Sequence, residues 1–592
     1  KMSEAVQNQF KALFEGDYPG IETLREQLIA PLWAGIDRPS LRVPVEEKDA
    51  GKIKAITIFA NQSSDINFVD VELAESVVLK NNRVTINRYI TKSIVDAYQS
   101  ALIFFHYTDP SKEWRVSYVY KGAMLSETTN LKRYTYLCGS GMHCRTAAER
   151  FADLAKAGGY PDNEAMTAAF SLEALTEDFY KELFDWYEWA VETAKYPVGS
   201  GSKVTLVSGN ENKGENIIRL ITRLMFVWFI KQKKLVPDWI FDSKDISEYL
   251  ADFDENSLTN GEYYNAILQN LFFATLNKDL KERAWAKGNG EDRSDDYGVK
   301  TLYRDNLKKS FFKENKADDL LNAFKEVPFL NGGLFECLDN THTRADGTNE
   351  QIYVDGFSRE ADRRAFVPNA LFFQQKDGNK EGLLHILKRY NFTIEENSPI
   401  DVEIALDPEL LGKVFENLLG VFTPETSDTA RHETGSFYTP REIVNYMVDQ
   451  SLKEYLKTNV TGLNDDLLDS IFESGHAEYD ATAQIPEQIR SDIKSALKKV
   501  KVLDPACGSG AFPMGMLNRI VDIYKLLSHD DELTQKAIYN LKKEIIENCI
   551  YGVDIQPIAV QISKLRFFIS LICEQEKDAD EDNFGYYPLP NL

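Results

Sequence analysis

The sequence predicts an α/β protein built from several domains. Its 592 residues are 43% hydrophobic and 27% charged, which is typical of soluble globular chains. At roughly 100–200 residues per domain, this length corresponds to about three or four domains. The spacing of apolar residues indicates a mixed α/β domain over residues 1–160, a mostly helical connector over 161–430, and half of a doubly wound sheet over 431–592.

Residues 1–160 are predicted to begin with two helices, at 6–14 and 21–28, and to continue as strands. The strand-like runs are rich in apolar residues, and charged or polar turns separate them. These runs are 53–59, 66–73, 84–86, 101–107, 114–120 and 134–137.

The connector is predicted to be helical because its apolar residues recur at helical spacing. Residues 165–193 predict one long helix and residues 215–231 another. The charged run 281–305 contains glycines and indicates an exposed loop. A further helix is expected to start at Pro408 and to stop at Gly420.

Residues 431–592 alternate helices and strands in the order expected of a doubly wound sheet. After a helix at 443–456 come a strand, a glycine-rich turn, two helices, a second strand and a last helix. These elements are expected at 500–503, 508–510, 514–527, 533–548, 550–553 and 559–571. Ligands of such sheets bind at the carboxyl ends of the strands, so the residues that follow the two strands are candidates for a site.

The formal net charge of −25 excludes a simple nucleic-acid coat protein, whose surface would be basic. A modular DNA enzyme stays compatible, because such enzymes confine positive charge to one cleft. The six cysteines are scattered without a Cys-x-x-Cys pair, so neither a disulfide framework nor a zinc site is expected. Neither a secretory signal nor a membrane span is predicted, and the expected location is the cytoplasm.

The turn after the first strand of the last region has the residues that a nucleoside cofactor needs. Gly508 and Gly510 allow a tight turn and a close approach of the backbone. Asp504 ends the strand, where a carboxylate can meet a cationic amine. Asp554 ends the next strand, where a carboxylate can accept hydrogen bonds from ribose hydroxyls, and Ile555 after it can lie against an adenine ring.

A dinucleotide fits this turn less well. Pyrophosphate binding favours Gly-x-Gly-x-x-Gly, whereas Pro513 stands at the third glycine position and Asp504 would face the anion. S-adenosylmethionine carries a cationic amine and no phosphate, so it suits Asp504 better. The alternative without a ligand is the tight strand–helix turn of any α/β protein, which a lone Gly-x-Gly would not distinguish from a binding turn.

The segment 504–512, which reads Asp-Pro-Ala-Cys-Gly-Ser-Gly-Ala-Phe, resembles the first motif of amino-methyltransferases. Tyr-Gly-Val-Asp-Ile at 551–555 resembles the second motif. The resemblance implies the first half of a Rossmann-like class I methyltransferase sheet. The residues of these motifs that it implies in cofactor binding are Asp504, Ala506, Gly508, Gly510, Phe512, Asp554 and Ile555.

Thr-Gly-Ser-Phe-Tyr-Thr-Pro at 434–440 resembles the motif that precedes the first one in adenine-specific DNA methyltransferases of the gamma arrangement. The family implies that Phe437, Tyr438 and Thr439 contact the methionine end of the cofactor. From the residues alone, the segment predicts a helix entry with Thr439 as the N-cap and Pro440 in the first turn. The two interpretations are compatible.

Segments 215–220, 329–335 and 410–418 resemble the connector of type IIG restriction–modification enzymes, which fuse an adenine methyltransferase to an endonuclease. The similarity covers about 165–592. It implies transfer of a methyl group from S-adenosylmethionine to the exocyclic amine of adenine in double-stranded DNA, in a restriction–modification or phage-defence system. Packing explains the three segments adequately, so they indicate a family and not a chemical site.

The catalytic tetrapeptide of that family, Asn/Asp-Pro-Pro-Tyr/Phe, is absent from the sequence, so no catalytic methyltransferase residue is assigned. It would orient the adenine amine and stack on the flipped base. Because it follows such a C-terminal stretch in the family, the chain is expected to be an N-terminal fragment, with the tetrapeptide and a target-recognition domain beyond Leu592. The fragment is expected to bind cofactor weakly or not at all and to transfer no methyl group.

Type IIG enzymes often carry a Mg²⁺-dependent nuclease at the N-terminus, which needs an Asp and a Glu-x-Lys on adjacent strands. The candidates are Asp70 and Glu72 on one strand, with Glu46 and Lys48 nearby in sequence. Glu-Glu-Lys at 46–48 fits the pattern but precedes Asp70, which is the wrong order. The favoured interpretation is a solvated charged loop and an edge strand, and nuclease activity stays a hypothesis.

Two other functions remain open. A protein or RNA amino-methyltransferase would use the same cofactor site, although the long connector argues against such compact enzymes. A non-catalytic DNA-sensing scaffold with a vestigial methyltransferase fold would suit the missing tetrapeptide. The gene sequence after Leu592 distinguishes these functions, because Asn-Pro-Pro-Tyr there supports the DNA methyltransferase and a stop codon supports the scaffold.

Overall fold

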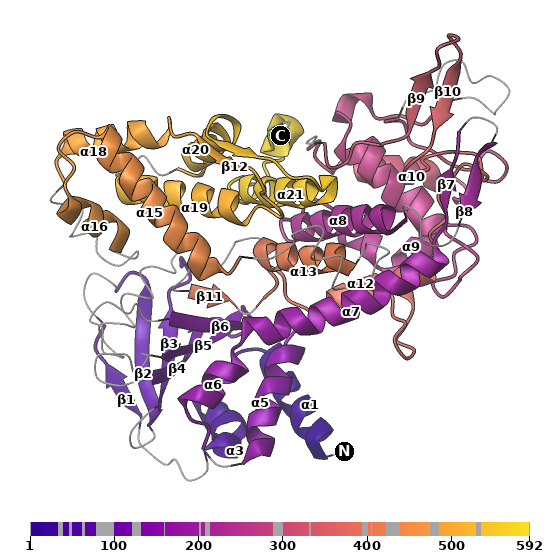
Figure 1. The fold of residues 1–592 in the computed structure, drawn as a ribbon. Helices are drawn as coiled ribbons and strands as arrows, with labels where there is room; N and C mark the ends of the chain where they lie inside the picture. The colour runs from indigo at the N-terminus through magenta and orange to yellow at the C-terminus, as the bar shows by residue number, and fades with distance from the viewer. Residues whose placement is uncertain are drawn as a thin grey trace. The chain divides into compact units, whose positions relative to one another are not determined.

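The computed structural model groups the chain into two compact units (Figure 1). The first unit comprises Lys1–Asp178, Lys388–Asp407 and Gly462–Glu487, and the second comprises Phe179–Leu387, Pro408–Thr461 and Gln488–Leu592. The sequence predicts a different division, into three parts, and that division stays a prediction. The residues that the structure describes are 2–33, 40–45, 50–61, 66–77, 100–120, 132–158, 160–200, 203–207, 213–287, 300–330, 333–393, 401–403, 405–421, 439–473, 485–528 and 534–590.

The first unit is built on a seven-stranded mixed sheet of order β1-β2-β3-β4-β5-β6-β11. Neighbours β3 and β4, and β6 and β11, are parallel, and the other neighbours are antiparallel. The strands are β1 (Leu41–Val43), β2 (Ile53–Asn61), β3 (Ile66–Leu73), β4 (Ser100–Tyr107), β5 (Trp114–Tyr120), β6 (Lys132–Cys138) and β11 (Asp401–Glu403). Strands β2 to β6 confirm the predicted strands of residues 1–160 except 84–86, which lies outside the described residues.

Helices α1 (Met2–Glu15), α5 (Arg145–Ala157) and α6 (Asn163–Ala169) lie against one face of this sheet (Figure 1). The ring of Phe14 in α1 lies 6.3 Å from that of Trp114 in β5 and 5.3 Å from that of Phe151 in α5. Aromatic packing therefore ties two helices to the middle of the sheet. The predicted helix at 21–28 is present as three short consecutive segments, α2 (Ile21–Leu24), η1 (Arg25–Ile29) and α3 (Ala30–Leu32).

The prediction of a single helix over 165–193 is wrong. Helix α6 ends at Ala169, and α7 (Leu172–Thr193) begins after a break at Phe170. The Phe170 side chain is fully buried, and its ring lies 4.8 Å from that of Tyr136. The break thus directs Phe170 into the aromatic cluster under the sheet, a tertiary contact that outweighs local helix propensity.

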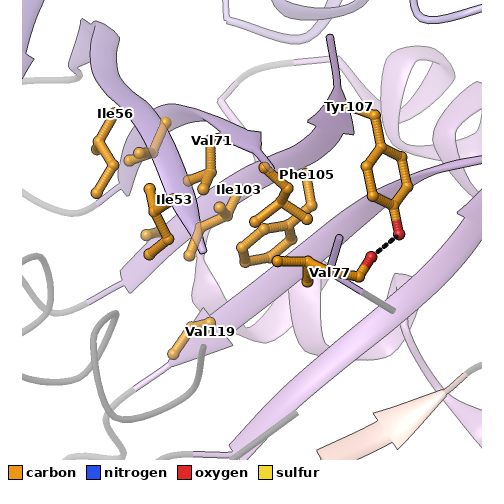
Figure 2. Close-up of a cluster of buried hydrophobic side chains, with 11 residues drawn as sticks. Ile53, Ile56, Val71, Val77, Ile103, Phe105, Tyr107 and Val119 are labelled. Atoms are coloured by element: carbon orange, nitrogen blue, oxygen red, sulfur yellow. Dashed lines mark hydrogen bonds between the residues drawn. The ribbon is translucent and has the colours of Figure 1, made fainter. Parts of the chain in front are cut away.

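The other face of the sheet carries an aliphatic core. Alternate residues of neighbouring strands meet there, among them Val71 of β3 and Ile103 and Phe105 of β4 (Figure 2). At the end of β4 the Tyr107 hydroxyl donates to the carbonyl of Val77 at 2.8 Å, which closes the cluster (Figure 2). These strands were recognisable in the sequence because apolar and polar residues alternate along β3 and β5, whereas β4 contains a continuous apolar run.

The second unit contains most of the predicted connector and is mainly helical. Its first part consists of α8 (Lys213–Lys231), η5 (Asp238–Phe241), α9 (Ser243–Tyr249), η6 (Tyr263–Leu268), η7 (Asn270–Leu276), η8 (Leu280–Glu282), α10 (Lys316–Phe324), α11 (Ala370–Phe373), α12 (Leu383–Lys388) and α13 (Pro408–Val421). Two hairpins, β7 (Tyr196–Val198) with β8 (Thr205–Val207) and β9 (Asn340–Thr343) with β10 (Asn349–Ile352), interrupt the helices. The predicted helices over 215–231 and from Pro408 are confirmed, and the latter ends one residue later than expected.

A buried ionic network organises this part. Arg223 of α8 lies 2.8 Å from Asp355 and also donates to the carbonyls of Leu334 and Glu336. The carboxylate of Asp339 accepts the backbone N–H groups of residues 354–357 at 2.7–3.0 Å. Because Asp339 precedes β9 and residues 354–357 follow β10, these bonds close the base of the hairpin.

The rest of the second unit has the strand and helix order that the sequence predicts. The elements are α15 (Arg441–Asn459), α18 (Glu487–Leu497), β12 (Val502–Asp504), α19 (Ala511–Leu526), α20 (Gln535–Asn548), β13 (Ile550–Gly552) and α21 (Pro557–Cys573). Strands β12 and β13 are parallel, with Leu503 beside Tyr551 and Asp504 beside Gly552. Their carboxyl ends therefore lie at the same edge, where the predicted cofactor residues follow.

The segment after α21 pairs with the connector. The side chain of Asn583 accepts from the N–H of Phe329 at 2.7 Å and donates to the Phe329 carbonyl at 2.8 Å and the Tyr586 carbonyl at 2.7 Å. Farther on, the N–H of Leu589 donates to the carbonyl of Leu330. The part of the predicted connector that lies in the second unit and the region with the glycine-rich turn thus pack together. No helix within the described ranges has the length and apolar character needed to cross a bilayer.

Candidate cofactor site

The turn between β12 and α19 depends on its two glycines. Gly508 has φ +52° and Gly510 has φ +86°, a region that residues with a Cβ rarely adopt. A Cβ added at Gly510 would overlap the hydroxyl of Ser563 in α21 and lie 3.1 Å from its Cβ. One added at Gly508 would lie 3.1 Å from the Oε1 atom of Glu416 in α13. The glycines therefore serve both the backbone conformation and the close packing of two helices on the turn.

Carboxylates accept the hydrogen bonds of three backbone amides in this turn. The N–H of Ala506 donates to Oδ1 of Asp504 at 3.1 Å, and that of Gly508 to Oδ2 of Asp554 at 2.9 Å. The N–H of Ser509 donates to Oε1 of Glu416 at 3.0 Å. A phosphate would need these amides as donors and would be repelled by the three negative charges. The turn therefore favours a cationic ligand.

Two carboxylate oxygens at the turn have no hydrogen-bond partner in the part of the chain that the structure describes. They are Oδ2 of Asp504 and Oε2 of Glu416, both buried among the described residues. A buried oxygen of this kind is costly unless a donor satisfies it, so it marks a place for a ligand donor. Asp554 has each oxygen bonded once, to Gly508 and to the N–H of Gln556 at 2.8 Å. Each carboxylate oxygen has a second lone pair, which leaves room for hydroxyl donors.

Cys507 lies inside the turn, and its thiol is expected to be unreactive. Burial, with the nearby charges of Asp554 and Asp504, raises the pKa of its thiol to about 11, so it stays protonated at neutral pH. A Cβ added at Gly552 of β13 would lie 3.0 Å from the Cys507 sulfur. The small residue at position 552 is therefore explained by the packing of the thiol between the two strands.

The helix that follows the motif at 434–440 has its N-cap one residue later than predicted. Pro440, not Thr439, occupies the N-cap position, and α15 begins at Arg441. The proline pyrrolidine has no group that can accept a hydrogen bond from the first helical amides. Thr439 lies directly before this cap, whereas Phe437 and Tyr438 lie outside the described residues. The role of these three residues in cofactor binding stays a prediction.

Helix α15 packs along α19, which starts at the turn. A Cβ added at Gly515 of α19 would lie too close to Val444 of α15 for the two helices to keep their spacing. Arg519 of α19 pairs with Asp449 of α15 at 2.6 Å. The Thr439 end of α15 and the glycine-rich turn are thus attached to one helix pair.

One face of the β12–β13 pair is exposed and apolar. Leu503 and Tyr551 are paired neighbours and are 64% and 47% exposed, and Val553 and Ile555 follow at alternate positions with 56% and 81% exposed. Parallel strands are normally covered on both faces. Beside the carboxylates, the described structure therefore presents apolar surface, including Ile555, on which an aromatic ring can lie.

Two of the predicted nuclease residues, Asp70 and Glu72, lie on β3, which pairs with β2 and with β4 and is therefore not the edge strand that the sequence favoured. Asp70 accepts hydrogen bonds from the Tyr18 hydroxyl and from Nε2 of His106, the latter at 3.2 Å. Glu72 accepts from the Thr108 hydroxyl at 2.8 Å. Glu46 and Lys48 lie outside the described residues. Within the described ranges no group of three or more His, Cys, Asp or Glu side chains is arranged to hold a metal ion, so the nuclease and its Mg²⁺ gain no support and stay a prediction.

Sequence comparisons agree with the motifs. The chain is 27% identical over 448 residues to RM.MjaORFECS2P of Methanocaldococcus jannaschii, whose name describes a type II restriction enzyme and methyltransferase. The match covers 71% of this chain and 31% of that relative. The adenine-specific methyltransferase BrxX of Escherichia coli O9:H4 (strain HS) is 29% identical over 127 residues, which are 21% of this chain and 10% of BrxX. The predicted resemblance is confirmed.

The chain spans about a third of the length of its restriction–modification relative from M. jannaschii and a tenth of BrxX. A solved structure of the type IIL restriction–modification enzyme MmeI in complex with DNA aligns with a TM-score of 0.34 and 12% identity over 70% of this chain and 39% of the MmeI chain. So low a TM-score adds no argument on the fold. No family model matches the chain.

Glu416 is the site residue that sequence reasoning missed. It lies in the segment 410–418, which also resembles the restriction–modification connector and was interpreted as packing. Its contact with Ser509 joins residues that are 93 positions apart in the sequence, and a local sequence pattern cannot predict such a contact. The available signal was a charged residue in the middle of a mostly apolar helix, three residues after Lys413.

Proposed function

We propose that this chain carries the cofactor-binding part of an adenine-specific DNA methyltransferase of a restriction–modification system, and that its cofactor is S-adenosylmethionine. The reaction would transfer a methyl group from the cofactor to the exocyclic amine of adenine in double-stranded DNA. The observation that carries the proposal is the turn whose amides are already bonded to Asp504, Asp554 and Glu416. The names of the relatives support the reaction class and its place in restriction–modification.

S-adenosylmethionine fits the residues at this turn. Its ammonium group is a cationic donor, and Oδ2 of Asp504 is a buried acceptor that has no partner within the described part of the chain. Asp554, at the carboxyl end of β13, would accept from the ribose hydroxyls with its remaining lone pairs. Ile555 would lie against the adenine ring, and Thr439 would border the methionine end with Phe437 and Tyr438. When bound, the cofactor supplies an activated methyl group on a sulfonium sulfur.

In this proposal the residues of the chain form a binding site that selects a cationic ligand. Asp504 and Asp554 would hold and orient the cofactor, and Gly508 and Gly510 keep the turn in a backbone conformation that other residues rarely adopt. The sequence contains no Asn/Asp-Pro-Pro-Tyr/Phe, so nothing identified here orients the adenine amine. We therefore expect these 592 residues to bind S-adenosylmethionine weakly and to transfer no methyl group to DNA by themselves.

We further propose that β12 and β13, with α19, α20 and α21, form the first half of a Rossmann-like methyltransferase sheet. The parallel pairing of the strands and the site at their carboxyl ends support this arrangement. The exposed apolar face of Leu503, Tyr551, Val553 and Ile555 is the surface that further elements of such a sheet would cover. A DNA methyltransferase of this kind would work in the cytoplasm.

Calorimetric titration with S-adenosylmethionine tests the site. Asp504→Asn and Asp554→Asn keep the side-chain shape and remove the charge. A hydrogen bond to a charged group contributes about 1.5–3 kcal/mol, so each variant should bind at least about tenfold more weakly than the wild type. Asp580→Asn, an exposed position after α21, is the matched control and should bind as the wild type does. Equal affinity of the wild type and both site variants would rule out the assignment.

Methyl transfer is tested separately with labelled cofactor and DNA substrates. The 592-residue chain should give no labelled DNA, and a chain that continues through an Asn-Pro-Pro-Tyr motif should methylate adenine. Label in DNA from the 592-residue chain alone would contradict the expected division of the active site. Label in protein or RNA, with none in DNA, would favour a different amino-methyltransferase.

A further inference from the structure

One face of α13 is directed at the proposed cofactor site. Glu409, Gly412 and Glu416 are spaced three and four residues apart, so they lie on one side of the helix. Glu409 forms an ion pair with Arg441, the first residue of α15. Gly412 and Glu416 both approach Ser509 in the glycine-rich turn. A helix of the predicted connector thus contacts two segments of the cofactor site that are far apart in sequence.

Ser509 is held by its backbone and its side chain at once. Its N–H and its hydroxyl both donate to Oε1 of Glu416, at 3.0 and 2.5 Å. Its carbonyl accepts from Nη1 of Arg566 in α21 at 3.2 Å, and both Ser509 and Arg566 are buried. The turn is therefore clamped between α13 on one side and α21 on the other.

Gly412 lets α13 come close enough for these hydrogen bonds. A Cβ added at Gly412 would lie 3.0 Å from the Ser509 hydroxyl oxygen and 3.3 Å from its Cβ, which is tighter than nearly all real contacts. The helix interior otherwise disfavours glycine by about 1 kcal/mol relative to alanine. The close approach gives a physical reason for glycine at this position.

We infer that Glu416 is a positioning residue that holds the glycine-rich turn in its cofactor-binding conformation. The inference rests on the proposed cofactor function. Gly508 and Gly510 lose more conformational freedom on ordering than other residues would, so the turn needs contacts that fix it from outside. Glu416 supplies two of them through its Oε1 atom, and through these contacts it acts on the cofactor by way of Ser509.

Hydrogen exchange without cofactor tests the positioning directly. Glu416→Ala removes the acceptor, whereas Glu416→Gln keeps a carbonyl oxygen that can accept from both Ser509 donors. We expect the amides of residues 508–510 to exchange on the order of tenfold faster in Glu416→Ala than in the wild type, and to be little changed in Glu416→Gln. Asn417→Ala, the next residue of α13, is the control for general loosening of the helix. Unchanged exchange in Glu416→Ala would overturn the inference.

Equilibrium dialysis with labelled S-adenosylmethionine gives the second readout. Glu416→Ala and Gly412→Ala should weaken binding by about tenfold, with Glu416→Gln within about threefold of the wild type. A Glu416→Gln variant as weak as Glu416→Ala would overturn the positioning role, because the charge and not the acceptor would then matter. If the wild type itself bound no cofactor, the proposed function would fail, and the exchange measurement would still decide whether Glu416 positions the turn.

Discussion

Arg223 of α8 and Asp355 form an ion pair of 2.8 Å in which neither side chain is more than 5% exposed. Removing one partner of such a pair leaves a buried charge without compensation, which costs about 3–5 kcal/mol. Arg223→Ala should therefore lower the free energy of unfolding of the second unit by about that amount, as measured by urea denaturation. The Arg223 guanidinium also donates to the carbonyls of Leu334 and Glu336, shortly before β9. Loss of these hydrogen bonds should therefore also loosen the base of the β9–β10 hairpin.

A surface pair and a double variant control this prediction. Arg344 and Glu350 are paired on the exposed hairpin, and Arg344→Ala should leave the unfolding midpoint unchanged. Arg223→Met combined with Asp355→Leu removes both charges and should be less damaging than Arg223→Ala. A double variant as unstable as the single one would mean that packing, and not the buried charge, dominates.

Gly510→Ala should be more damaging than the same change at another left-handed glycine. Gly510 and Gly347 have φ values of +86° and +83°, so the backbone penalty of about 1–2 kcal/mol is common to both. A Cβ at Gly510 would also overlap Ser563, whereas at Gly347 nothing lies within 4 Å. Thermal denaturation should show the larger loss for Gly510→Ala, together with weaker S-adenosylmethionine binding. Equal losses would show that the contact between α21 and the turn is unimportant.

The pair of Lys542 in α20 and Glu574 after α21 makes stability depend on pH. Burial by itself raises the pKa of Glu574, but the charge and hydrogen bond of Lys542, 2.7 Å away, outweigh it and hold the pKa below its usual value. A carboxyl whose pKa is lowered in the folded state stabilises it above the unfolded pKa of about 4.3, and the contribution is lost as the pH falls through the folded pKa. The pair should therefore stabilise the packing of α20 on α21 at neutral pH, and this contribution should be lost in acid.

Glu574→Gln tests this dependence. At pH 7 the free energy of unfolding should be about 1.5–3 kcal/mol lower than in the wild type, and the difference should shrink as the pH falls below about 4. Glu544→Gln is the control. Glu544 lies on the same helix as Lys542 and forms a half-exposed pair with Lys498, so this variant should change stability by less than about 1 kcal/mol. A difference between wild type and Glu574→Gln that stays constant with pH would contradict the linkage.

The Asn583 side chain is predicted to fasten the segment after α21 to the connector. Asn583→Asp keeps the acceptor for the Phe329 N–H but replaces the amide group that donates to the carbonyls of Phe329 and Tyr586. Unpartnered carbonyls then face a carboxylate, which is unfavourable. Hydrogen exchange in residues 583–590 should rise in Asn583→Asp, with little change in β2–β3 of the first unit. Unaltered exchange in 583–590 would show that the Leu589–Leu330 bond suffices.

The sequence predicted those elements that are determined by the order of apolar and polar residues within one short segment. Strands β2 to β6 carry alternating or continuous apolar residues within a few positions of each other, and Asp504 and Asp554 stand where strand ends and glycines mark them. Strand β11 was missed because it has three residues and pairs in parallel with β6, more than 260 positions earlier in the chain. The break at Phe170 was missed because its cause is the burial of one ring against Tyr136.

Polar contacts between distant residues were the least predictable part of the site. The sequence predicted that Asp504 meets a cationic amine, and this role stays a prediction; its Oδ2 atom has no partner among the described residues. It could not identify Glu416, because that role depends on how α13 docks on the turn. In the same way, Asp339 has four amide partners that follow the hairpin and none that sequence spacing would indicate.

The uncovered face of β12 and β13 has a practical consequence for handling the protein. Among the described residues, Leu503, Tyr551, Val553 and Ile555 form an exposed apolar surface, and neither β12 nor β13 pairs with a third described strand; both features favour self-association. The net charge of −25 opposes association at neutral pH but fades near the isoelectric point of about 4.9. Light scattering of concentrated samples should therefore rise as the pH approaches that point, and Val553→Lys should delay the rise.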